Sequence, residues 1–291
     1  MAHVPVLLKE AMEWLQIKPA GTYLDCTLGG GGYARAMAER LRGGRLIAID
    51  RDPSAIERAR EHLREFAEGI LYFQASFGEL QRIWQEVGAT PLDGIVADLG
   101  ISGDQIEDAA RGFSFVTDGP LDMRFDPEQT LTAARIVNFY GEKPLADLIY
   151  EFGEERRSRR IARAIVRARP LRGTRQLADL IERAAPRTSR GRIHPATRTF
   201  QALRIAVNNE LGELEKVLEA GPPMLAPGGR LVIVSFHSLE DRMVKQALRR
   251  WAERKALAIL TKHVVRPGEE EVRANAASRS ARLRAAERTS H

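Results

Sequence analysis

Short apolar runs alternate with amphipathic stretches along the N-terminal part of the chain. The runs at 23–26, 46–49, 70–73 and 94–97 predict buried strands, and the segments 33–42, 53–66 and 77–87 have the periodicity of helices. Asp52 followed by Pro53 is a typical N-cap and first-turn pair for the second of these helices. This alternation predicts an α/β fold, in which a parallel sheet has helices on both faces.

The pattern changes after Asp98. From about 130 to 219 nothing resembles a buried strand, and apolar side chains recur at three- and four-residue steps, which predicts one long amphipathic helix. These side chains are Phe200, Leu203, Val207, Leu211, Leu214 and Leu218. The sheet is expected to resume at 231–234, after an Ala-Pro-Gly-Gly turn at 226–229. We therefore expect a discontinuous sheet domain, 1–109 and 220–291, that is split by a mainly helical insertion, 110–219.

The chain is long enough to bury a full hydrophobic core, at 291 residues. A membrane-spanning helix needs about 18 uncharged apolar residues, and no stretch of the chain approaches that length. Its single cysteine, Cys26, can form neither an internal disulfide nor a multi-cysteine metal site, and its apolar surroundings predict a packed thiol. We expect a cytoplasmic protein that is neither secreted nor bound to a membrane.

Four consecutive glycines, residues 29–32, connect the first expected strand to the first expected helix. That strand ends at Asp25, and the next one ends at Asp50. Strand, glycine loop, helix and acid-terminated strand make one βαβ half of a nucleotide-binding fold. Glycines allow the backbone to approach a ligand closely. Asp50 is placed to accept hydrogen bonds from the two hydroxyls of a ribose.

The glycine pattern by itself leaves two cofactors open. The spacing Gly29-x-Gly31-x-x-Ala34, with an acid about 20 residues further on, also fits the dinucleotide fingerprint of an NAD-dependent oxidoreductase. Asp25 favours S-adenosylmethionine, because a carboxylate there would repel a pyrophosphate but attract the ammonium of a methionine moiety. The oxidoreductase remains the alternative.

Charge is distributed unevenly around the net value of +6. Residues 151–204 carry 15 basic and 5 acidic side chains, and 242–291 carry 13 and 5, whereas 1–150 carry 15 and 23. Two basic blocks beside an acidic half indicate a polyanionic partner, of which nucleic acid is the natural candidate. A non-catalytic RNA-binding assembly factor would share this feature.

Arginines recur at helical intervals inside the first basic block. They are Arg156, Arg160, Arg163 and Arg167, and they predict a phosphate-contacting face, with an ordinary solvated helix surface as the alternative. The C-terminal arginines fit either a last edge strand or a mobile basic tail. These are Arg279, Arg282, Arg284 and Arg288.

Several longer motifs, spread over almost the full length, carry a family resemblance. They are His3-Val-Pro-Val-Leu-Leu-Lys-Glu-Ala, the glycine loop, Ala48-Ile-Asp-Arg-Asp-Pro, Asp98-Leu-Gly-Ile-Ser, Arg111-Gly-Phe-Ser-Phe, Gly119-Pro-Leu-Asp-Met-Arg, Gly153-Glu-Glu-Arg, His194-Pro-Ala-Thr-Arg-Thr-Phe-Gln-Ala-Leu-Arg-Ile, Pro227-Gly-Gly-Arg-Leu and Ser235-Phe-His-Ser-Leu-Glu-Asp-Arg. Through them the chain resembles the bacterial small-subunit ribosomal RNA cytosine-N4 methyltransferases, the MraW or RsmH family.

The resemblance implies a Rossmann-like class I methyltransferase sheet with an inserted helical substrate-recognition domain. It also implies S-adenosylmethionine as cofactor and, as substrate, the exocyclic amine of one cytosine in the decoding region of small-subunit ribosomal RNA, free or in an assembling subunit. The family's cofactor positions fall on Gly31, Gly32, Tyr33, Asp50, Phe77, Asp98 and Gln105. The chain departs from the family at Tyr33, where histidine is common, at Gly103, where serine is usual, and in a shorter segment 254–267.

Substrate contacts are expected from the four arginines at helical intervals, Arg156, Arg160, Arg163 and Arg167, which we call the arginine stripe. They are also expected from the motifs that contain His194, Arg198 and His237. His237 has an equally good structural interpretation, the organisation of the turn into the next helix. Phe113, Phe115, Phe200 and Trp251 are candidates for stacking on an unpaired base, although such aromatics are more often core residues. The sequence assigns no catalytic base and no metal site, and it leaves the oligomeric state open.

Overall fold

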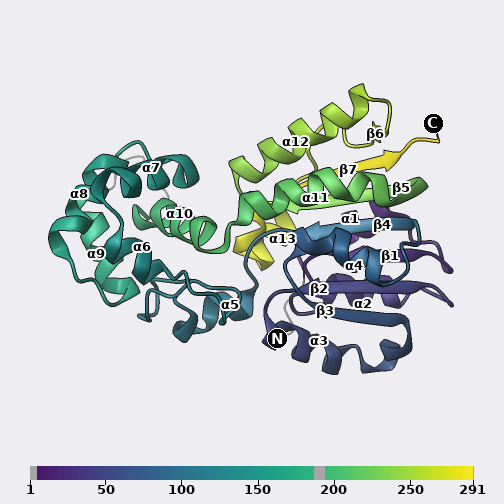
Figure 1. Ribbon diagram of the computed structural model, residues 1–291, viewed down its shortest axis with the longest axis horizontal. Helices are drawn as coiled ribbons and strands as arrows, with labels where there is room; N and C mark the ends of the chain where they lie inside the picture. Colours follow the sequence, from purple (N-terminus) through teal and green to yellow (C-terminus); the bar gives the residue numbers. More distant parts are fainter. Residues whose placement is uncertain (1–4, 187–193, 291) are drawn as a thin grey trace. The chain divides into compact units, whose positions relative to one another are not determined.

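The computed structural model describes residues 5–186 and 194–290 (Figure 1). It consists of two compact units, residues 1–100 with 211–291 and residues 101–210. The second unit therefore begins nine residues before the expected start, 110, and ends nine residues before the expected end, 219. His3 and Val4 of the N-terminal motif lie outside the described residues.

The first unit is built on a seven-stranded sheet of order β3-β2-β1-β4-β5-β7-β6. The first five of these strands pair in parallel, and β7 runs antiparallel to both of its neighbours. This confirms the predicted α/β fold. The strands are β1 Thr22–Asp25, β2 Arg45–Asp50, β3 Ile70–Gln74, β4 Leu92–Asp98, β5 Leu225–Ser235, β6 Leu257–Ile259 and β7 Arg282–Arg288.

Helices cover both faces of this sheet, because successive strand side chains point to opposite sides. Tyr23 and Leu46 pack with α1 (Leu8–Leu15), α2 (Gly32–Ala38) and α3 (Pro53–His62). Leu24 and Ile47 pack with α4 (Leu80–Glu86), α11 (Glu210–Met224) and α12 (Ser238–Glu253). As expected, Pro53 begins α3 and the side chain of Asp52 caps it by accepting a hydrogen bond from the Ser54 N–H.

Two parts of the sheet differ from the sequence-based expectation. The Ala-Pro-Gly-Gly segment is not a turn ahead of the strand: β5 begins at Leu225 and includes it, with a register irregularity opposite β4 and a positive φ at Gly228. The C-terminal basic block is neither an edge strand nor a tail. It forms β7, which lies between β5 and β6, and Arg284 is fixed there by ion pairing with Asp241 at 2.7 Å. In the chain, β7 is preceded by α13 (Glu269–Ala274) and the short η4 turn (Ala276–Ser280).

The second unit is mainly helical. Its helices are α5 Gly103–Glu107, α6 Ala133–Phe139, α7 Glu142–Gly153, α8 Ser158–Ala168, α9 Thr174–Ala184 and α10 Ala196–Asn208. They enclose a core of their own that includes Ile136, Ile149, Ile161 and Leu203. The chain thus leaves the sheet after β4 and returns to it at β5.

The long helix expected across 200–218 is in fact two helices. Asn209 adopts a left-handed conformation, with φ of 50°, between α10 and α11. Asparagine tolerates this conformation better than most residues. The apolar side chains continue at helical spacing across the break, but they serve two cores: Leu203 and Val207 pack in the second unit, and Leu214 and Leu218 pack under the sheet. Within the described ranges, none of the helices has the length and apolar character needed to cross a membrane.

Candidate functional site

The glycine loop follows β1, and its first two glycines, Gly29 and Gly30, face open space. Gly29 and Gly31 have positive φ values of 49° and 83°, which side chains with a Cβ rarely adopt. A Cβ built on Gly30 would meet no atom within 4 Å, and one on Gly29 would meet only the Thr27 carbonyl oxygen, at 3.9 Å. The loop therefore offers backbone to a ligand that can approach closely.

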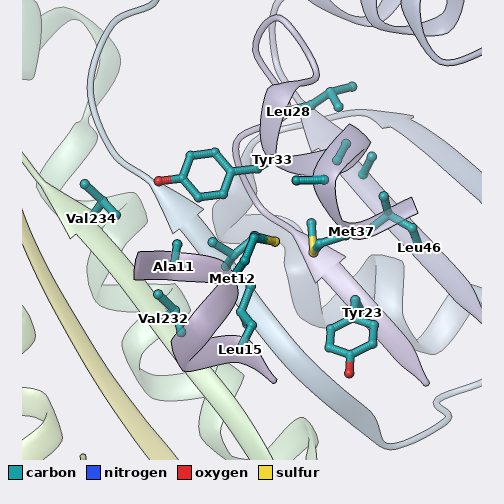
Figure 2. Close-up of a cluster of buried hydrophobic side chains, with 14 of the residues drawn as sticks. Ala11, Met12, Leu15, Tyr23, Leu28, Tyr33, Met37, Leu46, Val232 and Val234 are labelled. Carbon is teal, nitrogen blue, oxygen red and sulfur yellow. The ribbon is translucent and has the colours of Figure 1, made fainter. Parts of the chain in front are cut away.

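Gly32 and Tyr33 serve the packing of the first unit. A Cβ on Gly32 would lie 2.1 Å from Cγ of Pro5, so the N-terminal segment requires glycine there. The Tyr33 ring is only 3% exposed, and its hydroxyl donates a hydrogen bond to the Val6 carbonyl. Figure 2 shows this ring inside the buried cluster that includes Met12. A cofactor contact at position 33 would thus use the backbone.

Asp50 ties the end of β2 to the glycine loop. Its Oδ2 accepts a hydrogen bond from the Gly29 N–H at 2.8 Å, and its Oδ1 accepts one from the Asp52 N–H at 2.9 Å. Burial raises the pKa of Asp50, although these two N–H groups act in the opposite direction. Each carboxylate oxygen can accept a further hydrogen bond, so the geometry suits the expected contact with ribose hydroxyls.

Two further carboxylates are buried at the ends of the adjacent strands β1 and β4. Asp25 is 1% exposed, and its Oδ1 accepts a hydrogen bond from the Thr27 N–H at 3.0 Å. Its Oδ2, like Oδ1 of Asp98, is buried without a hydrogen-bond partner among the residues that the structure describes. Buried polar atoms are normally satisfied. Two unsatisfied acceptors beside an open loop therefore mark a place for a donor that a ligand brings.

The electrostatics of these carboxylates favour a cation. The pKa of Asp25 is raised from 3.8 to about 7, mainly by burial; the Thr27 N–H acts to lower it, and the negative charge of Asp50 acts to raise it. Burial also raises the pKa of Asp98 well above its ordinary value, as do the charges of Asp25, Glu240 and Glu271. Removing these groups from water while they carry like charge is costly. A positively charged ligand at this place would reduce that cost, so the site fits the cation of S-adenosylmethionine better than a pyrophosphate.

Phe77 begins the short η2 turn (Phe77–Glu79) that follows β3. Its half-buried ring packs against the core under the sheet. Ser76 and Glu79 close a capping box around this turn. Ser76 also contacts Glu213 of α11, 137 residues away in the sequence. This long-range contact has no local signal, and sequence reasoning missed it.

Gln105 belongs to the second unit. It is buried in α5, where its N–H donates to the Ser102 hydroxyl and its side-chain oxygen accepts from the Ser102 N–H, both at 3.2 Å. Ser102 caps the helix, and Gly103 occupies its first position without disturbing the cap. The contact of Gln105 with a cofactor stays a prediction.

His237 is the N-cap of α12, as its structural interpretation required. Its Nδ1 accepts a hydrogen bond from the Glu240 N–H at 3.4 Å, and its Nε2 lies 3.0 Å from Oε1 of Glu240. With a side chain 9% exposed, it is largely committed to this turn. A substrate contact by His237 stays a prediction.

The arginine stripe lies on the surface of the second unit. Arg160, Arg163 and Arg167 are exposed on α8, and Arg156 is exposed in the turn that precedes it. Ile161 and other apolar side chains on the opposite side of α8 are buried. Within the described ranges, Arg163 alone among the four has an acidic partner, Glu142, at 3.3 Å. The other three guanidinium groups present charge that no carboxylate of the described chain offsets.

His194 and its aromatic neighbours form a packed cluster. The His194 ring lies 4.7 Å from that of Phe115, which lies 4.9 Å from that of Phe200. His194 Nδ1 also accepts a hydrogen bond from the Ala196 N–H at 3.2 Å. Arg198 is exposed and donates to the Glu154 carbonyl at 3.2 Å. Arg198 is exposed, whereas His194 and Phe115 are half-buried and Phe200 is buried.

The other stacking candidates are engaged in packing. Phe113 stacks on Phe125 with centroids 5.2 Å apart. In the first unit, Trp251 donates a hydrogen bond to the Leu218 carbonyl at 2.8 Å and joins the core under the sheet. This agrees with the core interpretation, which sequence reasoning had weighed as the more common one.

The chain is similar over almost its full length to proteins of several bacteria. A ribosomal RNA small subunit methyltransferase H from Solibacter usitatus is 53% identical over 285 residues, which cover 98% of this chain and 99% of that protein. The protein of the same name from Acidobacterium capsulatum is 53% identical over 295 residues, covering 98% of each chain. Among solved structures, the N-methyltransferase NodS from Bradyrhizobium japonicum is 13% identical, covers 97% of this chain and 94% of its own, and has a TM-score of 0.45. The model of the MraW methylase family matches residues 1–289, and the chain belongs to that family.

Proposed function

We propose that this protein methylates the exocyclic N4 amine of one cytosine in the decoding region of small-subunit ribosomal RNA. As a member of the MraW methylase family it is a methylase. Its relatives at 53% identity are named as small-subunit ribosomal RNA methyltransferases, and the chain shares this activity, with S-adenosylmethionine as methyl donor. The choice of cytosine N4 within that RNA is the finer part of the proposal.

The observation that carries the proposal is the group of buried carboxylates around the open glycine loop. Asp50 would hold the ribose hydroxyls, and the unsatisfied oxygens of Asp25 and Asp98 would receive the cationic part of the cofactor. When bound, the sulfonium supplies a methyl group activated for in-line displacement. The protein contributes by aligning donor carbon and acceptor nitrogen and by excluding water, and such orientation supplies much of the acceleration.

The second unit would recognise the RNA. Residues 151–204 carry a large basic excess, and the exposed arginines of the stripe suit phosphate contacts, which dominate affinity for nucleic acids. Arg198 would add to this surface, and His194 would support its conformation through the aromatic cluster. A cytosine in a duplex cannot present its amine to a donor in a protein site, so the enzyme would act on an unpaired or extruded base.

The two alternatives make different predictions for ligands. An NAD-dependent oxidoreductase needs a pyrophosphate site, and the buried Asp25 opposes one. A non-catalytic assembly factor has no use for three carboxylates whose burial is costly. Equilibrium binding separates all three: we expect the protein to bind S-adenosylmethionine with at least a hundredfold preference over NAD, since roughly 3 kcal/mol separates paired from repelled charge at such a site. Tight binding of NAD and none of S-adenosylmethionine would overturn the proposal.

We expect the reaction in the cytoplasm, on ribosomal RNA either free or in an assembling small subunit. Methyl transfer to protein-free RNA and to isolated small subunits, measured side by side with labelled cofactor, distinguishes these two substrates. Incorporation into neither one would contradict the proposed function.

A further inference from the structure

Glu213 is a buried carboxylate on α11 that is bound by groups from two strand-end loops. It is 6% exposed. It accepts a hydrogen bond from the Ser76 hydroxyl and one from the Lys216 ammonium at 2.7 Å, and it lies 3.8 Å from the Arg51 guanidinium. Arg51 follows β2, and Ser76 follows β3. One side chain of the helix therefore reaches both loops.

The charge of Glu213 is stabilised by these partners. Burial acts to raise its pKa, but hydrogen bonds from Lys216 and Ser76, together with the charges of Lys216 and Arg51, outweigh burial and hold the pKa below its ordinary value. A buried carboxylate with this number of donors is a strong and well-oriented acceptor. Glu213 is thus an ionised anchor on a regular helix.

Ser76 joins the components of this network. Its hydroxyl donates to Glu213 and accepts from Arg51 Nη2 at 2.8 Å and from the Gly78 N–H at 3.2 Å. One donated and two accepted bonds use the full capacity of a hydroxyl group. A network whose central hydroxyl is fully satisfied rigidifies the segments that it connects.

Gly78 shows how closely the η2 turn approaches α11. A Cβ at this position would lie 2.2 Å from Oε2 of Glu213 and 2.9 Å from Cδ of Lys216. Only glycine allows the turn to rest on the Glu213 carboxylate without displacing it. The contact is therefore built into the backbone path and does not depend on side chains alone.

We propose that Glu213, acting through Arg51 and Ser76, positions Asp50 and Phe77 for the adenosine half of the cofactor. Arg51 directly follows Asp50, and Ser76 directly precedes Phe77. Ligand-contacting groups need supporting partners on rigid elements to hold productive geometry. Glu213 is a positioning residue, because it acts on the ligand through other residues. The inference rests on the proposed function, in which Asp50 holds the ribose, and on the cofactor contact that the family resemblance implies for Phe77.

The test compares two ligands that share the adenosine half. Glu213→Ala should weaken binding of S-adenosylmethionine and of 5′-methylthioadenosine, which lacks the amino acid, by the same factor, on the order of tenfold for one lost bond to a charged acceptor. Glu219→Ala, an exposed carboxylate on the same helix, is the matched control and should change neither affinity. In methyl transfer, KM for the cofactor should rise while kcat at saturation is retained.

A double-mutant cycle shows whether the network acts as a unit. Ser76→Ala alone should reproduce the loss, and the Ser76→Ala/Glu213→Ala double variant should bind little worse than either single variant. If Glu213→Ala does not fold, Ser76→Ala, which removes a single hydroxyl, carries the same comparison.

Three outcomes overturn the inference. The affinities are unchanged in a folded variant, the loss of affinity is confined to S-adenosylmethionine, or the losses caused by Ser76→Ala and Glu213→Ala add up in the double variant. A wild-type protein that binds neither ligand would instead contradict the proposed function. The two failures are therefore distinguishable.

Discussion

Asp25 should make the cofactor-free protein less stable as the pH rises. Its pKa is about 7 in the folded protein, against 3.8 as its ordinary value, mainly because of burial. The folded state thus holds this proton more tightly than the unfolded chain. The corresponding stability is fully present below pH 3.8 and is lost as the pH rises to about 7. At about 1.4 kcal/mol per pKa unit, the loss between pH 5 and pH 8 amounts to about 3 kcal/mol.

Asp25→Asn isolates this contribution. The amide keeps an acceptor for the Thr27 N–H but does not titrate, so the variant should lack the part of the pH-dependent loss that Asp25 causes. Urea unfolding at a series of pH values measures the difference in unfolding free energy between the two proteins. All three tryptophans, Trp14, Trp84 and Trp251, belong to the first unit, so their fluorescence reports on the unit that contains Asp25. We expect the wild type to lose about 3 kcal/mol relative to the variant from pH 5 to pH 8. Parallel curves would refute the reasoning.

The same residue predicts how cofactor affinity depends on pH. A cationic ligand attracts Asp25 only in its ionised form, so the affinity of the wild type for S-adenosylmethionine should decrease as the pH falls through about 7. Asp25→Asn should bind more weakly at pH 8 and show a flatter profile. Identical profiles would mean that Asp25 does not face the cation.

Three further predictions concern the other parts of the site. Asp50→Ala should weaken binding of S-adenosylmethionine by about 1–3 kcal/mol, the scale of hydrogen bonds to a charged acceptor, and leave RNA affinity unchanged; calorimetry that finds equal cofactor affinities would contradict this. Alanine at all four positions of the arginine stripe, Arg156, Arg160, Arg163 and Arg167, should lower the slope of log affinity against log salt by about one per lost phosphate contact, whereas an unaltered slope would identify the stripe as solvated surface. A variant in which a short linker replaces residues 110–209, so that Gln105 and α11 are kept, should, once circular dichroism confirms its folding, bind S-adenosylmethionine but methylate no RNA; methylation at the wild-type rate would remove RNA recognition from this unit.

The sequence predicted the parallel part of the sheet well, because its strands are apolar runs that are buried on both faces. Arg45 to Asp50 is one example, with four buried apolar residues inside β2. The position of β7 was not predictable in the same way. The charges of Arg282 and Arg284 in this strand are offset by Asp241, which lies on α12 more than forty positions away. A local pattern does not contain that partner.

The candidate site residues show the same difference between local patterns and long-range contacts. Asp25, Asp50 and Asp98 could be identified because each ends a predictable strand, and the carboxyl ends of parallel strands form the binding edge of such sheets. The packing of the Tyr33 ring and the anchoring role of Glu213 depend on contacts between distant segments. The capping role of His237 is local, because its partner Glu240 is three residues away, and the sequence had offered that role as one of two interpretations. The break at Asn209 was hidden because apolar residues keep helical spacing across it, although they enter two different cores.

The most direct test of the account is the identity of the methylated nucleoside. Small-subunit ribosomal RNA, free and within isolated subunits, would be incubated with the protein and methyl-labelled S-adenosylmethionine, digested, and mapped by mass spectrometry. The account predicts label in N4-methylcytidine at one cytosine of the decoding region, and much less of it when Asp50→Ala is assayed at a low cofactor concentration. Label that appears only on a ring carbon, on a ribose hydroxyl or in another nucleoside would contradict it.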